Sequence, residues 1–234
     1  MSLSATLLAD DQFVNKMYDI AYPTRLRYVP PLYHKYVNAV AVLFTARDPG
    51  RIRTKEYGSN NYSHTAFEKS ILKDPLMLSS YLNLIERVYK GAYIDNYKPG
   101  YRSIVFCASI EMCTRVKDYL KAKYHDLEVL RYVEEDPWQH VLDANTLVST
   151  LQSAGTALDM DGLSTVIMTT AISSSQTNIQ GFGRMREPKD GSTPTFLYFV
   201  CDSVDKHVEY HERKRVLLQE RAMAYKSIHM GIAL

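Results

Sequence analysis

The sequence has few cysteines, no long apolar run and, in its first residues, no pattern typical of a leader segment. Only three of its 234 residues are cysteine, Cys107, Cys113 and Cys201, and no two are spaced C-x-x-C. This pattern argues against a disulfide framework or a thiolate zinc site. No apolar stretch reaches the roughly eighteen residues that a membrane-spanning helix needs, and no basic and apolar segment opens the chain. These absences predict a soluble, cytoplasmic protein of a reducing compartment.

The charge is nearly balanced overall but is uneven along the chain. A 46% hydrophobic content is enough for an ordinary globular core, and the formal net charge is only +2. Between Tyr22 and Lys55, however, seven basic residues face the single acid Asp48, and tyrosines lie among them. Such a stretch can contact phosphates and stack on bases, or it can be an ordinary solvated surface. Taken alone, the composition favours the solvated surface.

Short apolar runs alternate with helical patterns from residue 101 onward. Strands are expected at 102–108, 127–133, 146–150, 166–170 and 195–201, with an earlier one at 36–45. Helices are expected at 61–72, 75–89, 109–120, after the cap Asp136-Pro137, within 173–186 and, as a long charged helix, at 205–228. Alternation of this kind predicts an α/β fold with a mostly parallel sheet covered on both faces. The loop 187–194, rich in proline, glycine and aspartate, is expected to be exposed.

The strongest chemical signal is the segment from Gln180 to Arg186, which follows a buried strand. Arg184 directly follows Gly183, and Arg186 comes two residues later. This placement suits delivery of positive charge to a phosphoryl group in transfer. Gln180 could position water or a phosphate oxygen. The same residues could instead be surface arginines bonded to carboxylates, since short glycine and arginine patterns recur by chance.

This segment resembles motif VI of superfamily 2 helicases (Q-x-x-G-R-x-x-R), and other segments resemble further motifs in the correct order. Residues 3–6 resemble motif III, residues 102–109 motif IV, and residues 149–159 motif V. The layout is similar to that of phage UvsW-type and XPB-like DNA helicases. The resemblance implies a RecA-like parallel sheet flanked by helices, with residues 1–20 ending a first lobe and residues 21–234 forming the second.

The resemblance also implies roles for individual residues. Arg184 and Arg186 would act as arginine fingers on the γ-phosphate of ATP, and Gln180 would touch the phosphates or the attacking water. Asp159, Gly183 and Ala157 would lie beside the nucleotide. Backbone phosphates of a nucleic acid, DNA rather than RNA, would be held by Ser109, Ser149 and Thr150. Ser4 and Thr6 of motif III would couple the state of ATP to the grip on nucleic acid.

The sequence departs from the family pattern at two positions. The second motif VI arginine is expected three residues after the first, where this chain has Glu187, so it is open which arginine reaches ATP. In motif V, Ala157 replaces the usual glycine, and Gly155 lies two residues upstream. Alanine would be strained at a positive φ, so the local backbone is expected to differ.

The sequence contains no G-x-x-x-x-G-K-[ST] loop to cradle phosphates. Glu134-Glu135-Asp136 is acidic but follows motif IV, whereas a magnesium-binding acidic box precedes motif III. The chain is therefore expected to be a fragment that cannot hydrolyse ATP alone. A missing N-terminal lobe would supply the phosphate loop and the Mg²⁺ ligands.

Several other features have two interpretations. His207 and His211 could bind a metal, although an exposed charged helix is the simpler reading. The basic residues Arg213, Lys214, Arg215 and Arg221 could track nucleic acid or be solvated. Trp138 could stack on a base or be a partly buried anchor, and Cys107 is expected in the core. The whole chain could also be a nucleic-acid-binding or protein-remodelling module with a helicase-like fold and no unwinding activity.

Overall fold

The computed structural model describes residues 11–23, 25, 34–154 and 160–234. The helices are α1 (Gln12–Ala21), α2 (His64–Lys73), α3 (Pro75–Ala92), α4 (Ile110–Lys123), α5 (Gln139–Asp143), α6 (Ser175–Phe182) and α7 (Asp205–Arg221), with short 3-10 turns at Pro49–Arg51 and Ile94–Asn96. The strands are β1 (Asn38–Thr45), β2 (Arg102–Cys107), β3 (Val129–Tyr132), β4 (Thr146–Thr150), β5 (Leu163–Met168), β6 (Thr195–Cys201) and β7 (Ala224–Ala233).

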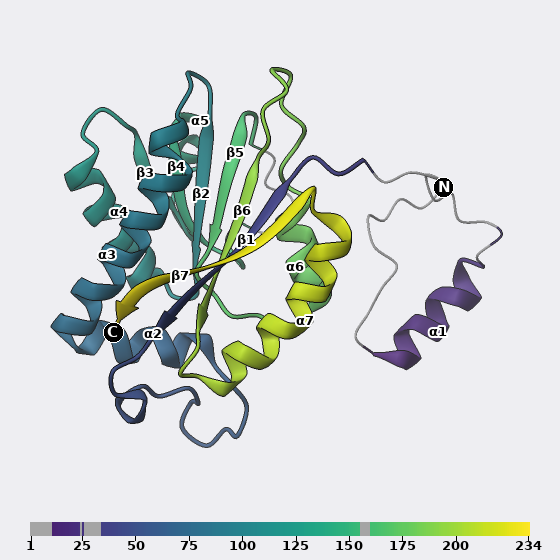
Figure 1. Ribbon diagram of the computed structural model, residues 1–234, viewed down its shortest axis with the longest axis horizontal. Coiled ribbons are helices and arrows are strands. Elements are labelled where there is room, and N and C mark those ends of the chain that lie inside the picture. The colour runs from purple at the N-terminus through teal and green to yellow at the C-terminus, as the bar shows by residue number, and fades with distance from the viewer. Residues whose placement is uncertain (1–10, 24, 26–33, 155–159) are drawn as a thin grey trace.

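The strands form one seven-stranded sheet in the order β3-β4-β2-β5-β6-β1-β7. Every adjacent pair is parallel. All carboxyl ends therefore meet at one edge, where α2 and the segment between β1 and α2 lie (Figure 1). The predicted α/β class with a RecA-like parallel sheet flanked by helices is confirmed.

Two hydrophobic cores lie on opposite faces of the sheet because successive strand residues point to opposite sides. Val40, Val42 and Phe44 of β1 pack with the apolar residues of α2, α3 and α4. Ala39 and Ala41 of the same strand pack with residues of α5, α6 and α7. The strands read as continuous apolar runs because both faces are buried, as expected for a parallel sheet.

The prediction of one long helix over 205–228 is wrong at its carboxyl end. Helix α7 stops at Arg221, and residues 224–233 form β7, which pairs with β1 at the edge of the sheet. Ile228, Met230 and Ile232 pack against the core at every second position. This two-residue period is the sequence signal for a strand, and it begins where the helical period ends.

The prediction that Asp136 caps a helix is also wrong. Helix α5 begins at Gln139, and its N-cap residue is Trp138. The carboxylate of Asp136 instead accepts hydrogen bonds from Arg131 Nε at 2.8 Å and from the Val133 N–H at 2.9 Å. This pair lowers the pKa of Asp136. Trp138 is 51% exposed and packs edge-on against Tyr132.

Among the helices in the described part of the chain, none combines the length and apolar character required to cross a membrane.

Candidate functional site

The carboxyl edge of the sheet gathers most of the residues singled out from the sequence. In open parallel sheets, ligands bind in crevices outside the carboxyl ends of the strands. Here β2 and β4 are neighbours, with Phe106 opposite Ser149 in register. The segments that leave these two strands, at Ser109 and at 150–154, therefore emerge side by side.

Arg184 reaches this edge from the segment that follows α6. Phe182 and Met185, which flank it, are 2% and 0% exposed, and the Met185 carbonyl accepts a 2.9 Å hydrogen bond from Tyr36 Oη. Gly181 brings α6 close to the sheet, because a Cβ there would lie 2.9 Å from Met168 Cε. The backbone on both sides of Arg184 is thus held by packing.

The guanidinium of Arg184 lies at the carboxyl ends of β2 and β4. Its Nη1 donates to the Ala154 carbonyl at 3.2 Å, and its Cζ lies 5.9 Å from the centre of the Phe106 ring. Partial burial lowers its pKa. A guanidinium with less water around it interacts more strongly with an anion. Gly183 and Arg186, on either side of this anchored region, are exposed.

The three residues predicted to hold nucleic-acid phosphates have different surroundings. Ser149 is fully buried, and its hydroxyl donates to the Tyr132 carbonyl. Ser109 caps α4 and donates its hydroxyl to Glu68 Oε2 at 2.7 Å. Thr150 lies at the end of β4, where its hydroxyl donates to Ser153 Oγ at 2.9 Å and accepts the Ser153 N–H at 3.0 Å. Thr150 therefore differs from the other two: it lies in a turn at the edge of the sheet, and its hydroxyl is not bound to an acidic side chain.

Sequence reasoning missed a buried acid behind this edge. Glu68 of α2 is fully buried and accepts the N–H groups of Ala108 and Ser109, both at 2.8 Å. Burial raises its pKa to about 7, although these hydrogen bonds act in the opposite direction. His64 Nε2 lies 3.9 Å from Glu68 Oε1, and His64 Nδ1 accepts the Ala171 N–H at 3.1 Å.

A tyrosine joins this acid and histidine to α7. Tyr62 Oη lies 2.6 Å from His64 Nδ1 and 2.5 Å from His207 Nε2, and His207 Nδ1 accepts the Cys201 N–H at 3.1 Å. Since both Nδ1 atoms accept backbone N–H groups, the neutral rings carry their protons on Nε2. Burial lowers the pKa of His207 to about 3 and that of His64 well below its usual value. Glu68, His64 and His207 thereby bind the backbone just after β2, after β5 and at the end of β6.

In helix α7, the structure supports neither a metal site at the histidines nor a fully solvated, charged surface. His207 is buried rather than exposed, and His211 Nδ1 pairs with Tyr198 Oη at 2.9 Å, so the two histidines share no ligand position. Lys214 is 3% exposed, and burial lowers its pKa to about 7. Arg213 and Arg215 pair with Glu209 and Glu212 of the same helix. A continuous basic face is therefore not present.

Other predicted site residues lie outside the described residues. These are Ser4 and Thr6 of the motif III resemblance, and Ala157 and Asp159 of the motif V resemblance. Gln180 belongs to α6, but its side chain is also outside the described part. Cys107, Cys113 and Cys201 are buried free thiols, as expected for Cys107. In the described ranges, no three His, Cys, Asp or Glu side chains form a group that could hold a metal ion.

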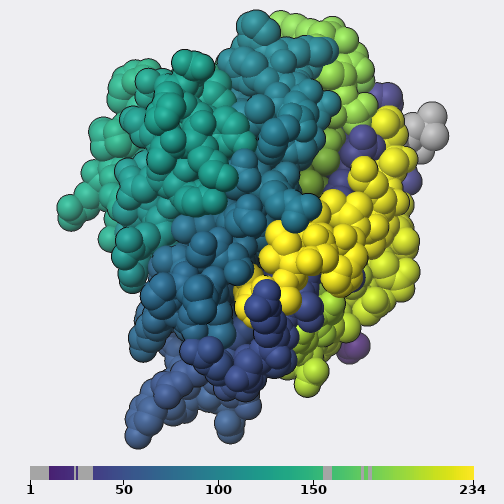
Figure 2. All heavy atoms as spheres, turned by 60° about the vertical axis from the view of Figure 1, so that its left-hand side comes forward, coloured from purple at the N-terminus to yellow at the C-terminus, as the bar shows by residue number. Residues whose placement is uncertain are grey.

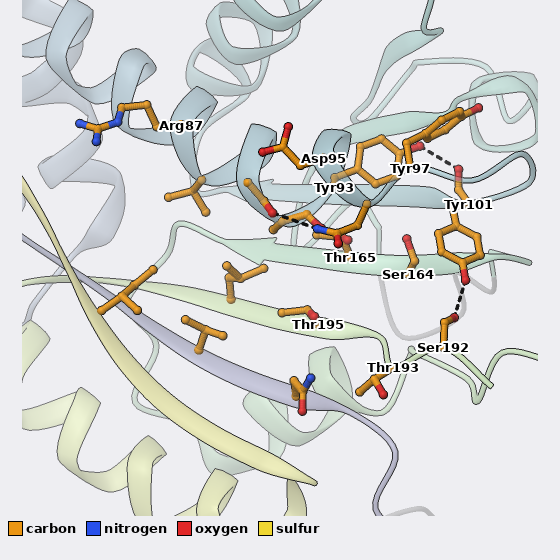
Figure 3. Close-up of a pocket in the computed structure, with 18 of the residues that line it drawn as sticks. Arg87, Tyr93, Asp95, Tyr97, Tyr101, Ser164, Thr165, Ser192, Thr193 and Thr195 are labelled. Atoms are coloured by element: carbon orange, nitrogen blue, oxygen red, sulfur yellow. Dashed lines mark hydrogen bonds between the residues drawn. The ribbon is translucent and has the colours of Figure 1, made fainter. Parts of the chain in front are cut away.

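A separate hollow of about 830 Å³ lies toward the amino ends of the strands, between α3 and β7. Figure 2 shows the face on which α3 and β7 run beside each other. Tyr93, Tyr97 and Tyr101 form one side of it, and Thr165 and Thr195 lie on its floor (Figure 3). Tyr93 Oη donates to the Tyr101 carbonyl at 2.7 Å, and Tyr101 Oη donates to Ser192. The residues predicted from sequence do not line this hollow.

No protein-family model matches the chain, and no curated protein sequence matches it. Among solved structures, T4 UvsW superimposes with a TM-score of 0.55 and 11% identity, over 82% of this chain and 41% of that chain. S. cerevisiae Dbp5 bound to Gle1 and IP6 superimposes with a TM-score of 0.53 and 12% identity, over 94% of this chain and 48% of that chain. The isolated C-terminal domain of the DEAD-box protein Dbp5 gives 0.51 and 13%, over 83% of this chain and 91% of that domain.

These comparisons concern the fold. The chain spans about half of the length of the Dbp5 chain, 48%, and nearly the whole of the separate C-terminal domain, 91%. The chain has a seven-stranded parallel sheet flanked by helices, and it superimposes on that domain with a TM-score of 0.51. The chain therefore has the RecA-like fold of a helicase C-terminal domain.

Proposed function

We propose that this chain is the C-terminal RecA-like lobe of an ATP-dependent superfamily 2 nucleic-acid helicase or translocase. The observation that carries the proposal is the position of the Arg184 guanidinium, at the carboxyl ends of β2 and β4 in a RecA-like sheet. Solved structures that share the fold include Dbp5 bound to RNA and ADP BeF3, with a TM-score of 0.53, and Mss116p bound to ssRNA and AMP-PNP, with 0.51.

The arginines suit the polyphosphate of ATP. Phosphoryl transfer places negative charge on the transferred group, and a preorganised guanidinium stabilises that charge. Arg184 is preorganised because Phe106 and the Ala154 carbonyl hold it, while Arg186 lies exposed two residues further along. We propose that Arg184 faces the γ-phosphate and that Arg186 contacts the phosphates from the solvent side. Mg²⁺ and the phosphate loop would come from an N-terminal lobe.

The strand of nucleic acid would cross the same edge. Thr150 and the turn that follows it would present a hydroxyl and backbone N–H groups, with Thr150 and Ser153 exchanging their mutual hydrogen bonds for bonds to a phosphate. Ser109 would join them by exchanging its hydrogen bond to Glu68 for one to a phosphate. Ser149 would act only by holding β4 to β3, since its side chain is buried. We propose contact with a single strand. The neighbours give no support for DNA over RNA, because the complexes of two of them, Dbp5 and Mss116p, contain RNA.

Movement would follow from closure of two lobes on ATP. Each closure brings Arg184 toward the nucleotide and shifts the Thr150 turn relative to the strand held by the other lobe. Opening after hydrolysis releases that grip. A cycle of closure and opening would move the protein along the strand.

Arg184→Ala in the full-length protein tests the proposal. We expect a loss of nucleic-acid-stimulated ATP hydrolysis of about a thousandfold, the scale of an arginine finger, with ATP binding retained. Arg213→Ala is the matched control because Arg213 is exposed and pairs with Glu209 on its own helix. Steady-state turnover and equilibrium binding of a fluorescent ATP analogue are the measurements. Unchanged turnover in Arg184→Ala would refute the assigned role.

One observation favours the alternative of a binding or protein-remodelling module without unwinding activity. Arg184 already contacts a carbonyl and a ring of its own unit, as a structural arginine would. In that case, the double variant Arg184→Ala/Arg186→Ala would lower the melting temperature but leave turnover per folded molecule unchanged. Strand-displacement and translocation assays on the full-length protein separate unwinding from remodelling.

A further inference from the structure

A second hollow, of about 900 Å³, is lined by the segment after β1, by α2 and by the start of α3. It lies at the carboxyl end of the sheet, toward which the strand arrows point in Figure 1. Five of its lining residues are cations and two are acids; the cations are Arg51, Arg53, Lys55, Lys69 and Lys73, and the acids are Glu56 and Asp74.

Most of the positive charge in this hollow is not neutralised locally. Arg51 pairs with Asp74 at 2.6 Å, and Glu56 accepts a hydrogen bond from Ser63. Within the part of the chain that the structure describes, the side chains of Arg53, Lys55, Lys69 and Lys73 have no acid within ion-pair distance. Clustered cations without local acids attract a polyanion.

Two apolar side chains stand at the same hollow. Tyr57 has a relative exposure of 106%, and Leu76 is 81% exposed. Full exposure of a tyrosine ring leaves both faces open for stacking on an unpaired base. In a duplex, by contrast, the base faces are already stacked on their neighbours, and only a flipped or terminal base could cover the ring.

The backbone that shapes the hollow is fixed. The Arg53 N–H donates to Ser70 Oγ at 2.9 Å, the Ser63 N–H donates to the Thr54 carbonyl at 2.8 Å, and Lys55 pairs with Tyr62 in an antiparallel bridge. Asp74 caps α3 and also holds Arg51. The cations therefore project from a preorganised surface, which reduces the entropy lost on binding.

The same helix connects the hollow to the motif IV region. Lys69 and Lys73 lie on the outer face of α2, whereas Glu68 on its inner face accepts the N–H groups of Ala108 and Ser109. A nucleic-acid strand that leaves the sheet near Ser109 would therefore meet α2 next, and the outer face of α2 carries these lysines. None of the helicase motifs in the sequence includes these lysines.

We propose that this hollow is an additional binding site for a single-stranded nucleic acid, with its phosphates on Lys69, Lys73 and Lys55 and a base stacked on Tyr57. The site would extend the strand path beyond the Thr150 turn. The inference rests on the proposed nucleic-acid function but concerns residues that take no part in ATP hydrolysis.

The test is fluorescence anisotropy of the full-length protein with short oligothymidylate and oligouridylate strands, and with a duplex of the same length, over a range of salt concentrations. For Lys69→Gln/Lys73→Gln we expect weaker binding to both strands and a salt slope shallower by about 0.7 for each lost phosphate contact. For Tyr57→Ala we expect affinity for single strands to fall at least about fivefold, the lower range for loss of one stacked base, with an unchanged salt slope. Lys121→Gln/Lys226→Gln is the charge-matched control on other exposed surfaces, and it should lose less affinity than the α2 variant.

Equal affinity and salt slope in wild type and Lys69→Gln/Lys73→Gln would overturn the proposal, and so would equal losses in the α2 and control variants. A loss confined to duplex probes, with Tyr57→Ala unaffected, would overturn the single-strand assignment. This readout is independent of Arg184. Failure of the helicase proposal would leave strand binding at α2 intact, and failure of this inference would leave ATP hydrolysis sensitive to Arg184→Ala.

Discussion

The two ends of the sheet are built from different chemistry, although each borders a hollow of similar size. At the amino end, two prominent charged groups have local partners: Asp190 accepts hydrogen bonds from Lys98 and Tyr101, and Arg102 Nε donates to the Ala144 carbonyl at 2.7 Å. At the carboxyl end, burial raises the pKa of Glu68 and lowers that of His64, and among the described residues no acid pairs with Lys69 or Lys73 of α2. This difference supports the proposal that the carboxyl end of the sheet, and not the amino end, binds the anionic ligands.

The largest expected effect on stability comes from a substitution at the amino end of the sheet. Gly162 has a φ of +74°, and a Cβ there would lie 2.1 Å from the Gly100 carbonyl oxygen. Gly162→Ala should therefore lower the free energy of unfolding by about 3 kcal/mol, since the backbone must move and the conformation is strained. Urea denaturation measures this. Gly100→Ala is the matched control, because Gly100 also has a positive φ but has space for a Cβ, and it should cost about 1 kcal/mol. Equal effects of the two substitutions would contradict the close-approach argument.

The next effect is a pH dependence of stability that comes from Glu68 at the carboxyl end of the sheet. The pKa of Glu68 rises from 4.5 to about 7 in the folded chain. The folded state therefore binds more protons than the unfolded state in this window, so the Glu68 contribution makes stability fall as pH rises from 4.5 to 7. The change corresponds to about 3 kcal/mol.

Glu68→Gln should remove that fall, because the amide keeps a hydrogen-bond acceptor but does not ionise. Urea denaturation across the same pH range compares it with Glu111→Gln, in which an exposed carboxylate of α4 is changed. If wild type and Glu68→Gln had parallel stability profiles, the buried carboxylate would not be the titrating group.

The smallest expected effect on stability comes from a substitution at the amino end of the sheet. Tyr101→Phe removes the hydroxyl that donates to Asp190 and Ser192 while keeping the ring. Because Asp190 is exposed and Ser192 is only partly buried, we expect a loss of stability within about 1 kcal/mol. The midpoint of thermal unfolding and the affinity for oligothymidylate are the measurements. A marked loss of strand binding would place function at the amino end and invalidate the comparison.

The sequence predicted the parts of the fold that depend on local periodicity. The runs 146–150 and 195–201 are β4 and β6 with the same boundaries, because a strand buried on both faces is a continuous apolar run. Strand β7 was missed because its residues are half exposed at the sheet edge, so their apolar pattern is diluted by polar side chains. Edge strands carry the weaker pattern for that reason.

The candidate site was only partly predictable. The motif order predicted that Arg184 lies at the carboxyl end of the sheet, where the structure has it, since the place of a segment after a strand determines the edge at which it emerges. The chain Glu68–His64–Tyr62–His207 could not be read from the sequence. Its members come from α2, the segment before α2, and α7, and only the tertiary fold brings them together. Lys214 is a similar case. A lysine between two arginines is expected on the surface from sequence, and only the packing of α7 on the sheet shows that it is buried.

Hydrogen–deuterium exchange of the full-length protein, with and without a non-hydrolysable ATP analogue, tests the central claim most directly. We predict that bound nucleotide slows exchange in the segment around Arg184 and in the turn after Thr150, and that it leaves the tyrosine-lined segment 93–101 unchanged. Slower exchange at 93–101 with no change around Arg184 would contradict the claim that the carboxyl end of this sheet faces the nucleotide.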